Sequence, residues 1–259
     1  MSAMDMFWAA PPISRTLAAS AFFLSVCCHT GMLSFGYVLF TFAQLMKFPP
    51  YIWTPITSFL ITGAQIGIVI DTYFLYTYSS QLEMGNPRLS GTGDYFMYLV
   101  FVCSVILGLN AFVTGGVVFI SALILAMCYT STQDARGQKA TFIVVQIPAQ
   151  FIPYAMLLMT LVMNGAGAAK IQATGLVAAH LYDFLTRLYP TFRGGRNMLS
   201  TPAFVKRMWE TTVPGVGNRA YGTAFTPAQR PGAASGSTSG AVLPESWRSR
   251  GSGHRLGGD

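Results

Sequence analysis

The chain has 259 residues, of which 52% are hydrophobic and only 10% are charged, and its mean hydropathy is +0.47. The few charges fall between long apolar runs, a composition that indicates a membrane protein rather than a water-soluble domain. The net charge of +7 needs no nucleic acid to explain it, because basic flanks beside membrane spans suit the anionic headgroups of the lipid bilayer.

Crossing about 30 Å of hydrocarbon takes roughly 20 apolar residues. Six stretches approach or exceed this length, so we predict an all-α, polytopic membrane protein with six transmembrane helices. In chain order they are Leu17–Phe40, Pro55–Tyr78, Tyr95–Val113, Val117–Thr132, Ala140–Asn164 and Ile171–Tyr189. The third and fourth, separated only by Thr114-Gly115-Gly116, are expected to form a tight helical hairpin. The first is expected to be retained, because the apolar run after Arg15 is too long for a cleaved signal peptide.

Several kinds of site are not expected. All the cysteines lie within predicted spans, which argues against a disulfide framework. They are Cys27, Cys28, Cys103 and Cys128. The chain contains no phosphate-binding loop of the form Gly-x-x-x-x-Gly-Lys followed by Ser or Thr. We predict no cofactor and no metal site.

The Lys and Arg residues in short flanks predict the orientation. Under a six-span layout, one side receives Arg15, Arg88, Arg136, Lys139, Arg193, Arg196, Lys206 and Arg207, and the other receives Lys47 and Lys170. Both termini are therefore predicted to be cytosolic.

The character of the chain changes after the membrane domain, which we place at residues 1–190. Residues 191–210 form a juxtamembrane segment with a predicted amphipathic helix at Thr201–Trp209, where a Thr cap and a first-turn Pro favour initiation. Residues 211–245 are rich in Gly, Ser, Thr, Ala and Pro, which predicts a disordered linker with a reach on the order of 30 Å. Residues 246–259 are predicted to be a docking peptide.

Polar residues inside the spans are candidates for function. Asp71 is costly at membrane depth and is a functional candidate, unless it lies near the cytosolic interface where its carboxylate reaches water. The same span carries Thr57, Thr62 and Gln65. The spacing of four between Gln146 and Gln150 predicts that both lie on one helix face, beside Pro148 and Pro153, which would loosen the helix. The alternative for these residues is ordinary interhelical hydrogen bonding.

Four strings carry a resemblance to a known family. They are FPPYIWTPITSF (Phe48–Phe59), TYFLYTYSSQLE (Thr72–Glu83), GLVAAHLYDFL (Gly175–Leu185) and GGRNMLSTPAF (Gly194–Phe204). In this order and spacing they resemble the derlin family, rhomboid-like pseudoproteases of the endoplasmic reticulum membrane. The resemblance covers most of Phe48–Trp209. It implies a rhomboid-like fold and a role in retrotranslocation of misfolded client polypeptides, with a ubiquitin ligase complex as partner. It leaves open whether the chain works as a half-channel or a homo-oligomer.

The C-terminal peptide similarly resembles the SHP box, by which derlins bind the hexameric AAA+ segregase valosin-containing protein. Glycines permit close, extended backbone approach, an arginine offers a charged fork for a carboxylate, and a leucine supplies an apolar anchor. The residues assigned to docking are Trp247, Gly251, Gly253, Arg255, Leu256 and Gly257.

An active rhomboid-type intramembrane serine protease is the first alternative. His180 follows the small-residue pattern Gly175 to Ala179, where active rhomboids carry their base. The region of the nucleophile, Gly115–Leu123, contains Ser121 as its only hydroxyl, and no glycine flanks it. We expect Ser121 to bond to the carbonyl one helical turn back. No enzyme is therefore predicted, and Gly175, Ala179 and His180 are assigned to helix packing.

A small-solute channel or transporter is the second alternative. No inverted repeat and no pair of broken helices in the sequence indicates a solute site. In rhomboid-like proteins the second and fifth spans border a lateral opening to lipid, where a polypeptide would meet hydrogen-bonding groups. We therefore assign a client path or lateral gate to Thr57, Thr62, Gln65, Asp71, Gln146 and Gln150.

Overall fold

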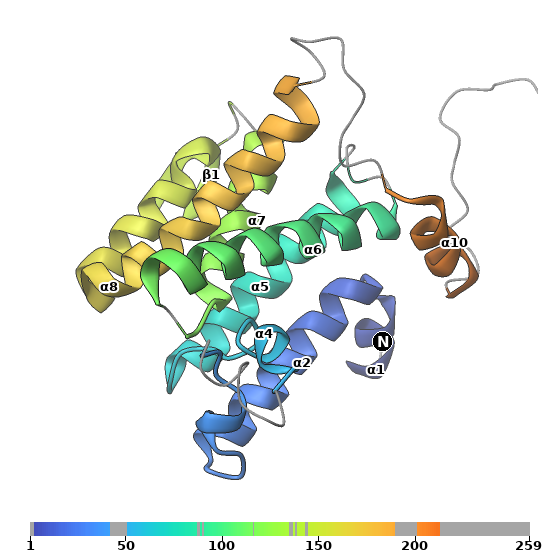
Figure 1. The fold of residues 1–259 in the computed structure, drawn as a ribbon. Helices are drawn as coiled ribbons and strands as arrows, with labels where there is room; N and C mark the ends of the chain where they lie inside the picture. Colours follow the sequence, from blue (N-terminus) through green and yellow to red (C-terminus); the bar gives the residue numbers. More distant parts are fainter. Residues whose placement is uncertain are drawn as a thin grey trace, which may run out of the picture. The chain divides into compact units, whose positions relative to one another are not determined.

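The computed structural model describes residues 3–41, 51–86, 89, 91–115, 117–134, 137, 139–142, 145–189 and 201–212. The elements are α1 (Ala3–Ala9), α2 (Pro12–His29), η1 (Phe35–Tyr37), α4 (Thr54–Thr57), α5 (Ile66–Gly85), α6 (Thr92–Leu109), η2 (Asn110–Thr114), α7 (Ile120–Asp134), β1 (Lys139–Phe142), β2 (Val145–Pro148), η3 (Ala149–Phe151), α8 (Ile152–Asp183), η4 (Phe184–Leu188) and α10 (Ala203–Thr212) (Figure 1). Helices dominate, which confirms the predicted all-α class, and the strands pair as one small antiparallel hairpin. The predicted linker beyond Thr212 and the predicted docking peptide lie outside the described residues.

The first predicted span starts earlier and ends earlier than expected. The helix α2 begins at Pro12, which suits the first helical turn because its missing N–H would have no partner there. It ends at His29, and Gly31 then takes a φ of +78°, a left-handed conformation that commonly closes a helix. The prediction Leu17–Phe40 is therefore wrong at its C-terminal end, because the apolar composition continues past this turn.

The second predicted span, Pro55–Tyr78, is wrong as a single helix. The chain forms the short helix α4, leaves helical geometry, and resumes as α5 at Ile66. Gln65, directly before α5, has a φ of +54°, which is unfavourable for a residue with a Cβ atom. Bonds from elsewhere in the fold must hold this break in place.

Side chains of α2 supply these bonds. The Ser25 hydroxyl donates to the carbonyl of Leu60 at 3.1 Å and accepts from the amide of Thr62 at 2.9 Å. The Nε2 atom of His29 lies 3.2 Å from the carbonyl oxygen of Thr62. Irregular backbone persists at membrane depth only where the protein pairs its polar groups, and this pairing meets that condition.

The third and fourth predicted spans agree with the structure. The helix α6 continues through the π-helical turn η2 and ends at Gly115, whose φ is +65°. The amide of Asn110 in this turn donates to the carbonyl of Ile106 and to the hydroxyl of Thr174 on α8, at 2.8 Å each. The following helix, α7, is apolar on all sides from Ala122 to Cys128, where every residue is at most 2% exposed. It lies between α5 and α8 at the centre of the core.

The fifth predicted span, Ala140–Asn164, is helical only from Ile152 onward. Its first part forms the hairpin, in which Gln146 pairs with Thr141 across the two strands. Gln150 lies in the 3-10 turn η3, so the prediction that Gln146 and Gln150 share a helix face is wrong. Pro153 stands in the first turn of α8, where it favours the helix instead of loosening it.

The helix α8 contains two limbs, residues 152–164 and 166–183. They meet at Gly165, whose φ of 81° and ψ of 174° are open only to glycine. Figure 1 shows that the element labelled α8 turns back on itself. The second limb corresponds to the sixth predicted span, which continues through η4.

Large apolar side chains lie on the outside of these helices. Phe23 is 72% exposed, Phe112 85% and Val162 78%. Among the described helices, Thr92–Thr114 and Ala149–Leu188 are long and apolar enough to cross a membrane, and Ile120–Gln133 is a shorter apolar helix. An apolar exterior of this kind suits contact with lipid better than contact with water.

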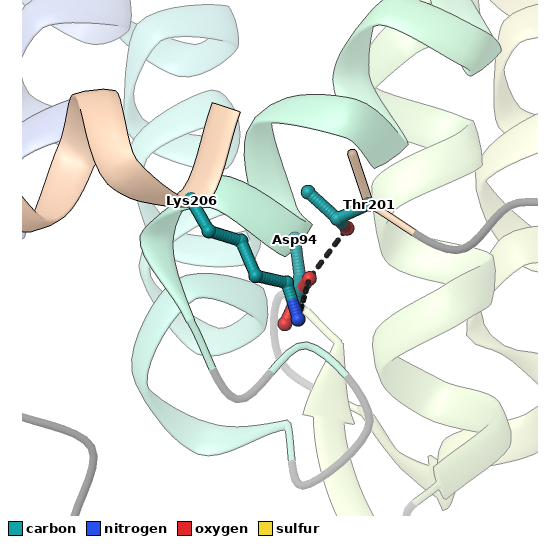
Figure 2. Close-up of polar contacts among 3 residues, drawn as sticks. All are labelled: Asp94, Thr201 and Lys206. Atoms are coloured by element: carbon teal, nitrogen blue, oxygen red, sulfur yellow. Dashed lines mark hydrogen bonds and ion pairs between the residues drawn. The ribbon is translucent and has the colours of Figure 1, made fainter. Parts of the chain in front are cut away.

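The predicted amphipathic helix at Thr201–Trp209 corresponds to α10, which packs against α6. Thr201 does not cap its own helix as expected. Its hydroxyl donates to the carboxylate of Asp94 in the first turn of α6, at 2.5 Å (Figure 2). The Nζ atom of Lys206 lies 3.5 Å from the same carboxylate. One acidic residue therefore holds the juxtamembrane helix at the N-terminal end of α6.

Candidate functional site

A cavity of about 780 Å³ lies between α5, α7 and both limbs of α8. These elements belong to the second, fourth, fifth and sixth predicted spans. The second and fifth predicted spans, to which the client path was assigned, both contribute to the lining of the cavity. Its walls are mainly apolar, with a small number of polar groups among them.

Methionines form one wall of the cavity. Met156, Met159 and Met163 lie on the first limb of α8 and all line the cavity. Spacings of three and four residues place them on one helix face. Methionine side chains are unbranched and polarisable, so they fit apolar partners of varied shape. This wall is suited to ligands that differ in their apolar side chains.

Polar groups share the lining of the cavity with the methionines. Asp71 on α5 accepts a hydrogen bond from the amide of Gly63 at 2.8 Å. Ser121 on α7 and Thr160 and Asn164 on α8 also line the cavity. Hydrogen-bonding groups are therefore available at membrane depth, where lipid offers none.

Gln172 on the second limb of α8 is the most unusual of these polar groups. It lines the cavity and is only 3% exposed, yet its Oε1 atom accepts no hydrogen bond from the described residues. A buried amide oxygen without a donor costs about 1–3 kcal/mol. Buried polar groups in proteins are nearly always paired, so this exception needs a reason.

Ser121 and His180 are not brought together. The Nδ1 atom of His180 lies 2.9 Å from the hydroxyl of Tyr129, and the two rings are 4.3 Å apart. Tyr129 follows Ser121 by eight residues on α7, about 12 Å along the helix axis. A nucleophile and its base must lie within hydrogen-bond reach, and this arrangement does not supply that geometry.

The expected bond from Ser121 to a carbonyl one turn back is wrong. The helix α7 begins at Ile120, so no helical turn precedes Ser121. Its hydroxyl lies instead at the start of the helix, among the residues that line the cavity.

Gly175 marks a close crossing of α7 and α8. A Cβ atom at this position would stand 1.9 Å from the carbonyl oxygen of Ala122. Ala178 and Ala179, further along α8, are fully buried. The small residues therefore let the second limb of α8 lie directly against the backbone of α7.

Known proteins resemble the chain over most of its length. A sequence model of the Der1-like family matches residues 10–203. The chain belongs to the Der1-like family. It is 31% identical over 211 residues to Derlin-1 of Homo sapiens, covering 78% of this chain and 81% of that protein. It is 27% identical over 210 residues to Derlin-1 of Arabidopsis thaliana (79% and 77%) and 25% identical over 212 residues to Derlin-2.2 of Zea mays (77% and 83%).

The family assignment confirms the resemblance predicted from the sequence strings. Together with the apolar helices, it makes this Der1-like chain an all-α, polytopic membrane protein. One predicted string, Thr72–Glu83, lies entirely within α5, and another, Gly175–Leu185, ends in the π-helical turn after α8.

Asp71 of this Der1-like chain lies far along α5 from the end of that helix that lies beside the start of α2. It is the sixth residue of α5, and Glu83 follows twelve residues later, about 18 Å along the axis. The carboxylate of Glu83 accepts from the amides of Ile13 and Ser14, at 3.1 and 2.8 Å, at the start of α2. Glu83 therefore marks the end of α5 that lies beside Arg15. Asp71 therefore lies about 18 Å along α5 from the end that carries Glu83.

Of the residues assigned to a client path, Asp71 lines the cavity and the other five do not. The Thr57 hydroxyl donates to the carbonyl of Val38 at 2.8 Å, Thr62 is buried in the break, and Gln65 is exposed before α5. Gln146 and Gln150 belong to the hairpin and the turn after it. The tail residues assigned to docking lie outside the described residues.

The sequence reasoning missed the methionine wall and Gln172. The methionines form a 3–4 spacing in the fifth predicted span, which is a local signal of a shared helix face. Gln172 carried no local signal, since a single polar residue near a span end is ordinary.

Proposed function

We propose that this chain is a non-catalytic membrane factor for retrotranslocation of misfolded proteins from the endoplasmic reticulum to the cytosol. The observation that carries the proposal is the cavity between α5, α7 and α8, which joins an adaptable apolar wall to hydrogen-bonding groups at membrane depth. A polypeptide that leaves the lumen must keep its peptide groups paired, and hydrocarbon offers no partners for them. The cavity supplies such partners.

The arrangement of Ser121 and His180 supports a role without bond cleavage. His180 bonds to Tyr129 rather than to Ser121. Active intramembrane proteolysis remains the second candidate because Ser121 lines the cavity. Ser121→Ala and His180→Ala separate the two functions: both changes would abolish cleavage by a protease, whereas a retrotranslocation factor would keep clearing clients at near wild-type rates.

The work of extraction would come from a partner. The chain has no phosphate-binding loop, so we propose that its C-terminal peptide recruits a hexameric AAA+ segregase, valosin-containing protein, on the cytosolic side. The linker would let the peptide reach the segregase beneath the membrane. A ubiquitin ligase complex and misfolded client polypeptides complete the proposed partners. We propose that both termini lie in the cytosol.

A pull-down of the purified segregase tests the docking step. The full chain should retain it, and a chain ending at Ser249 should not. Arg255→Ala should weaken retention about tenfold or more, as for a central arginine in an interface, while Arg230→Ala in the linker should leave it unchanged. Equal recovery with and without the last ten residues would contradict the proposal.

Client clearance tests the complete function. The full chain should lower the half-life of a misfolded luminal reporter in cells that lack their own derlins, and the chain ending at Ser249 should not. A truncated chain that clears the reporter at the full rate would show that the segregase is not recruited through this tail.

A further inference from the structure

The cavity described above contains one feature that its packing does not explain. Only 3% of the surface of Gln172 is exposed, and the residue lies in α8, which packs against α7. Its amide oxygen has no hydrogen-bond donor among the described residues. Leucine or methionine would fill a similar volume in a helix at no such cost. A ligand that pairs with the amide would account for it.

The chemistry of the amide defines the ligand. A glutamine side chain has one carbonyl acceptor and an NH₂ donor, and its terminal bond can turn either group toward the cavity. The group that matches both is another amide, and the commonest amide in a membrane is the peptide unit. Lipid tails have no hydrogen-bond donor and no acceptor, so they would leave the amide of Gln172 unpaired.

Only a peptide unit that is not already hydrogen-bonded can bind to Gln172, which restricts the class of ligand further. In an intact transmembrane helix the interior N–H and C=O groups are all bonded within the helix. Free peptide groups occur at membrane depth only where a helix is broken or the chain is extended. Gln172 can therefore distinguish a broken segment from an intact helix of the same composition.

The methionines of the cavity fit the same ligand. Met159 and Met163 face the cavity from the first limb of α8, and their flexible side chains can pack against different sequences. The methionines would hold the apolar side chains of the segment while Gln172 pairs with its backbone. The cavity would then select for interrupted helical structure and not for a sequence.

We infer that the cavity between α5, α7 and α8 recognises membrane-embedded polypeptide segments with an interrupted helix, through a hydrogen bond that a free peptide N–H of the segment donates to the Oε1 atom of Gln172. This inference rests on the proposed function, because it names the class of client that the site takes. It concerns binding alone and requires neither the segregase nor the linker.

Two peptides with a photoreactive group test it. One is an uninterrupted apolar helix of about 20 residues, long enough to span the bilayer. The other has the same composition, with its glycine and proline moved from the ends to the centre, where they break the helix. Each is incorporated with the full-length protein into phosphatidylcholine vesicles, and cross-linking is quantified and mapped.

The broken peptide should cross-link to the wild-type protein roughly fivefold more than the intact one, as expected for one added hydrogen bond in this environment. The mapped sites should fall on the cavity wall that carries Met159 and Met163. Gln172→Leu should remove the preference. The same substitution at Gln81, an exposed residue of α5 outside the cavity, should keep it.

A stability measurement separates recognition from structure. If Gln172 is kept for a ligand, Gln172→Leu should melt at the same temperature as the wild type or higher, because it removes an unpaired buried amide. A variant that is at least as stable and has lost the preference supports the inference. Gln172→Met provides a second, unbranched replacement should the leucine variant misfold.

Three results would overturn the inference: equal cross-linking of both peptides to the wild type, a preference that survives in a folded Gln172 variant, or cross-links that map away from the cavity. None of them bears on segregase recruitment, which the tail truncation decides separately. Conversely, loss of segregase binding would remove the proposed function while leaving the peptide preference measurable.

Discussion

Gly175→Ala is expected to separate α7 from α8. The added Cβ atom would stand 1.9 Å from the carbonyl oxygen of Ala122 and 2.6 Å from its carbonyl carbon. Ordinary contact between such atoms is about 3.5 Å, so the helices must move apart by roughly 1.5 Å. The obstacle is the backbone of a buried helix, which cannot rotate away as a flexible side chain can.

The magnitude follows from overpacking. Added carbon atoms in a tightly packed core typically cost about 1–3 kcal/mol, and a collision with backbone belongs at the upper end of that range. For a chain of this size about 3 kcal/mol corresponds to a fall in melting temperature of roughly 6–12 °C. The measurement is thermal unfolding in detergent, followed through the reaction of a thiol-specific dye with Cys128, which is fully buried on α7.

Gly167→Ala is the matched control. Gly167 lies in the same limb of α8, and an added Cβ atom there would meet nothing within 4 Å. This change should be neutral or stabilise the protein by up to about 1 kcal/mol, because alanine is the better helix former. If Gly175→Ala melts as high as Gly167→Ala, the close crossing and the packing role assigned to Gly175 are both wrong.

Three other substitutions probe the architecture by the same melting assay or by proteolysis. Gly165→Ala should cost about 1–3 kcal/mol, because the φ of 81° with a ψ of 174° is open only to glycine; a neutral result would mean that the two limbs do not need this turn. Glu83→Ala should cost about 2 kcal/mol through loss of its bonds to the first turn of α2, whereas Gln81→Ala should have little effect. Asp94→Ala should speed limited proteolysis within α10 more than Lys206→Ala, because the ion pair contributes less than about 1 kcal/mol while Asp94 also accepts the hydrogen bond of Thr201; equal rates would argue against the Thr201 bond.

The sequence predicted best where local pattern decides the structure. The third and fourth spans are apolar runs divided by glycines, and α6 and α7 follow them closely. The amphipathic helix after the membrane domain was also found, because its Pro and its spacing of cations are local features. In these segments the helices themselves follow from local sequence pattern.

The failures lie where distant residues decide. The break between α4 and α5 depends on Ser25 and His29, which precede it by more than thirty residues and give no local sign of this role. The hairpin before α8 is rich in β-branched residues, which favour strands. A prediction based on the number of apolar residues includes this run in the membrane span that follows. Gln172 was overlooked for the same reason, since its unpaired oxygen is a property of the packed helices and not of its neighbours in sequence.

One physical rule connects the broken second span with the cavity. Non-helical backbone at membrane depth must be paired by protein, and the chain meets this demand for its own break through Ser25, His29 and Asp71. A client with an interrupted helix also has unpaired backbone groups at membrane depth, and these groups need hydrogen-bond partners from another protein. The amide oxygen of Gln172, which has no partner among the described residues, can accept a hydrogen bond from such a backbone group. The protein would therefore stabilise in a client the feature that it already stabilises in itself, and an intact helix, which makes no such demand, would gain nothing by entering.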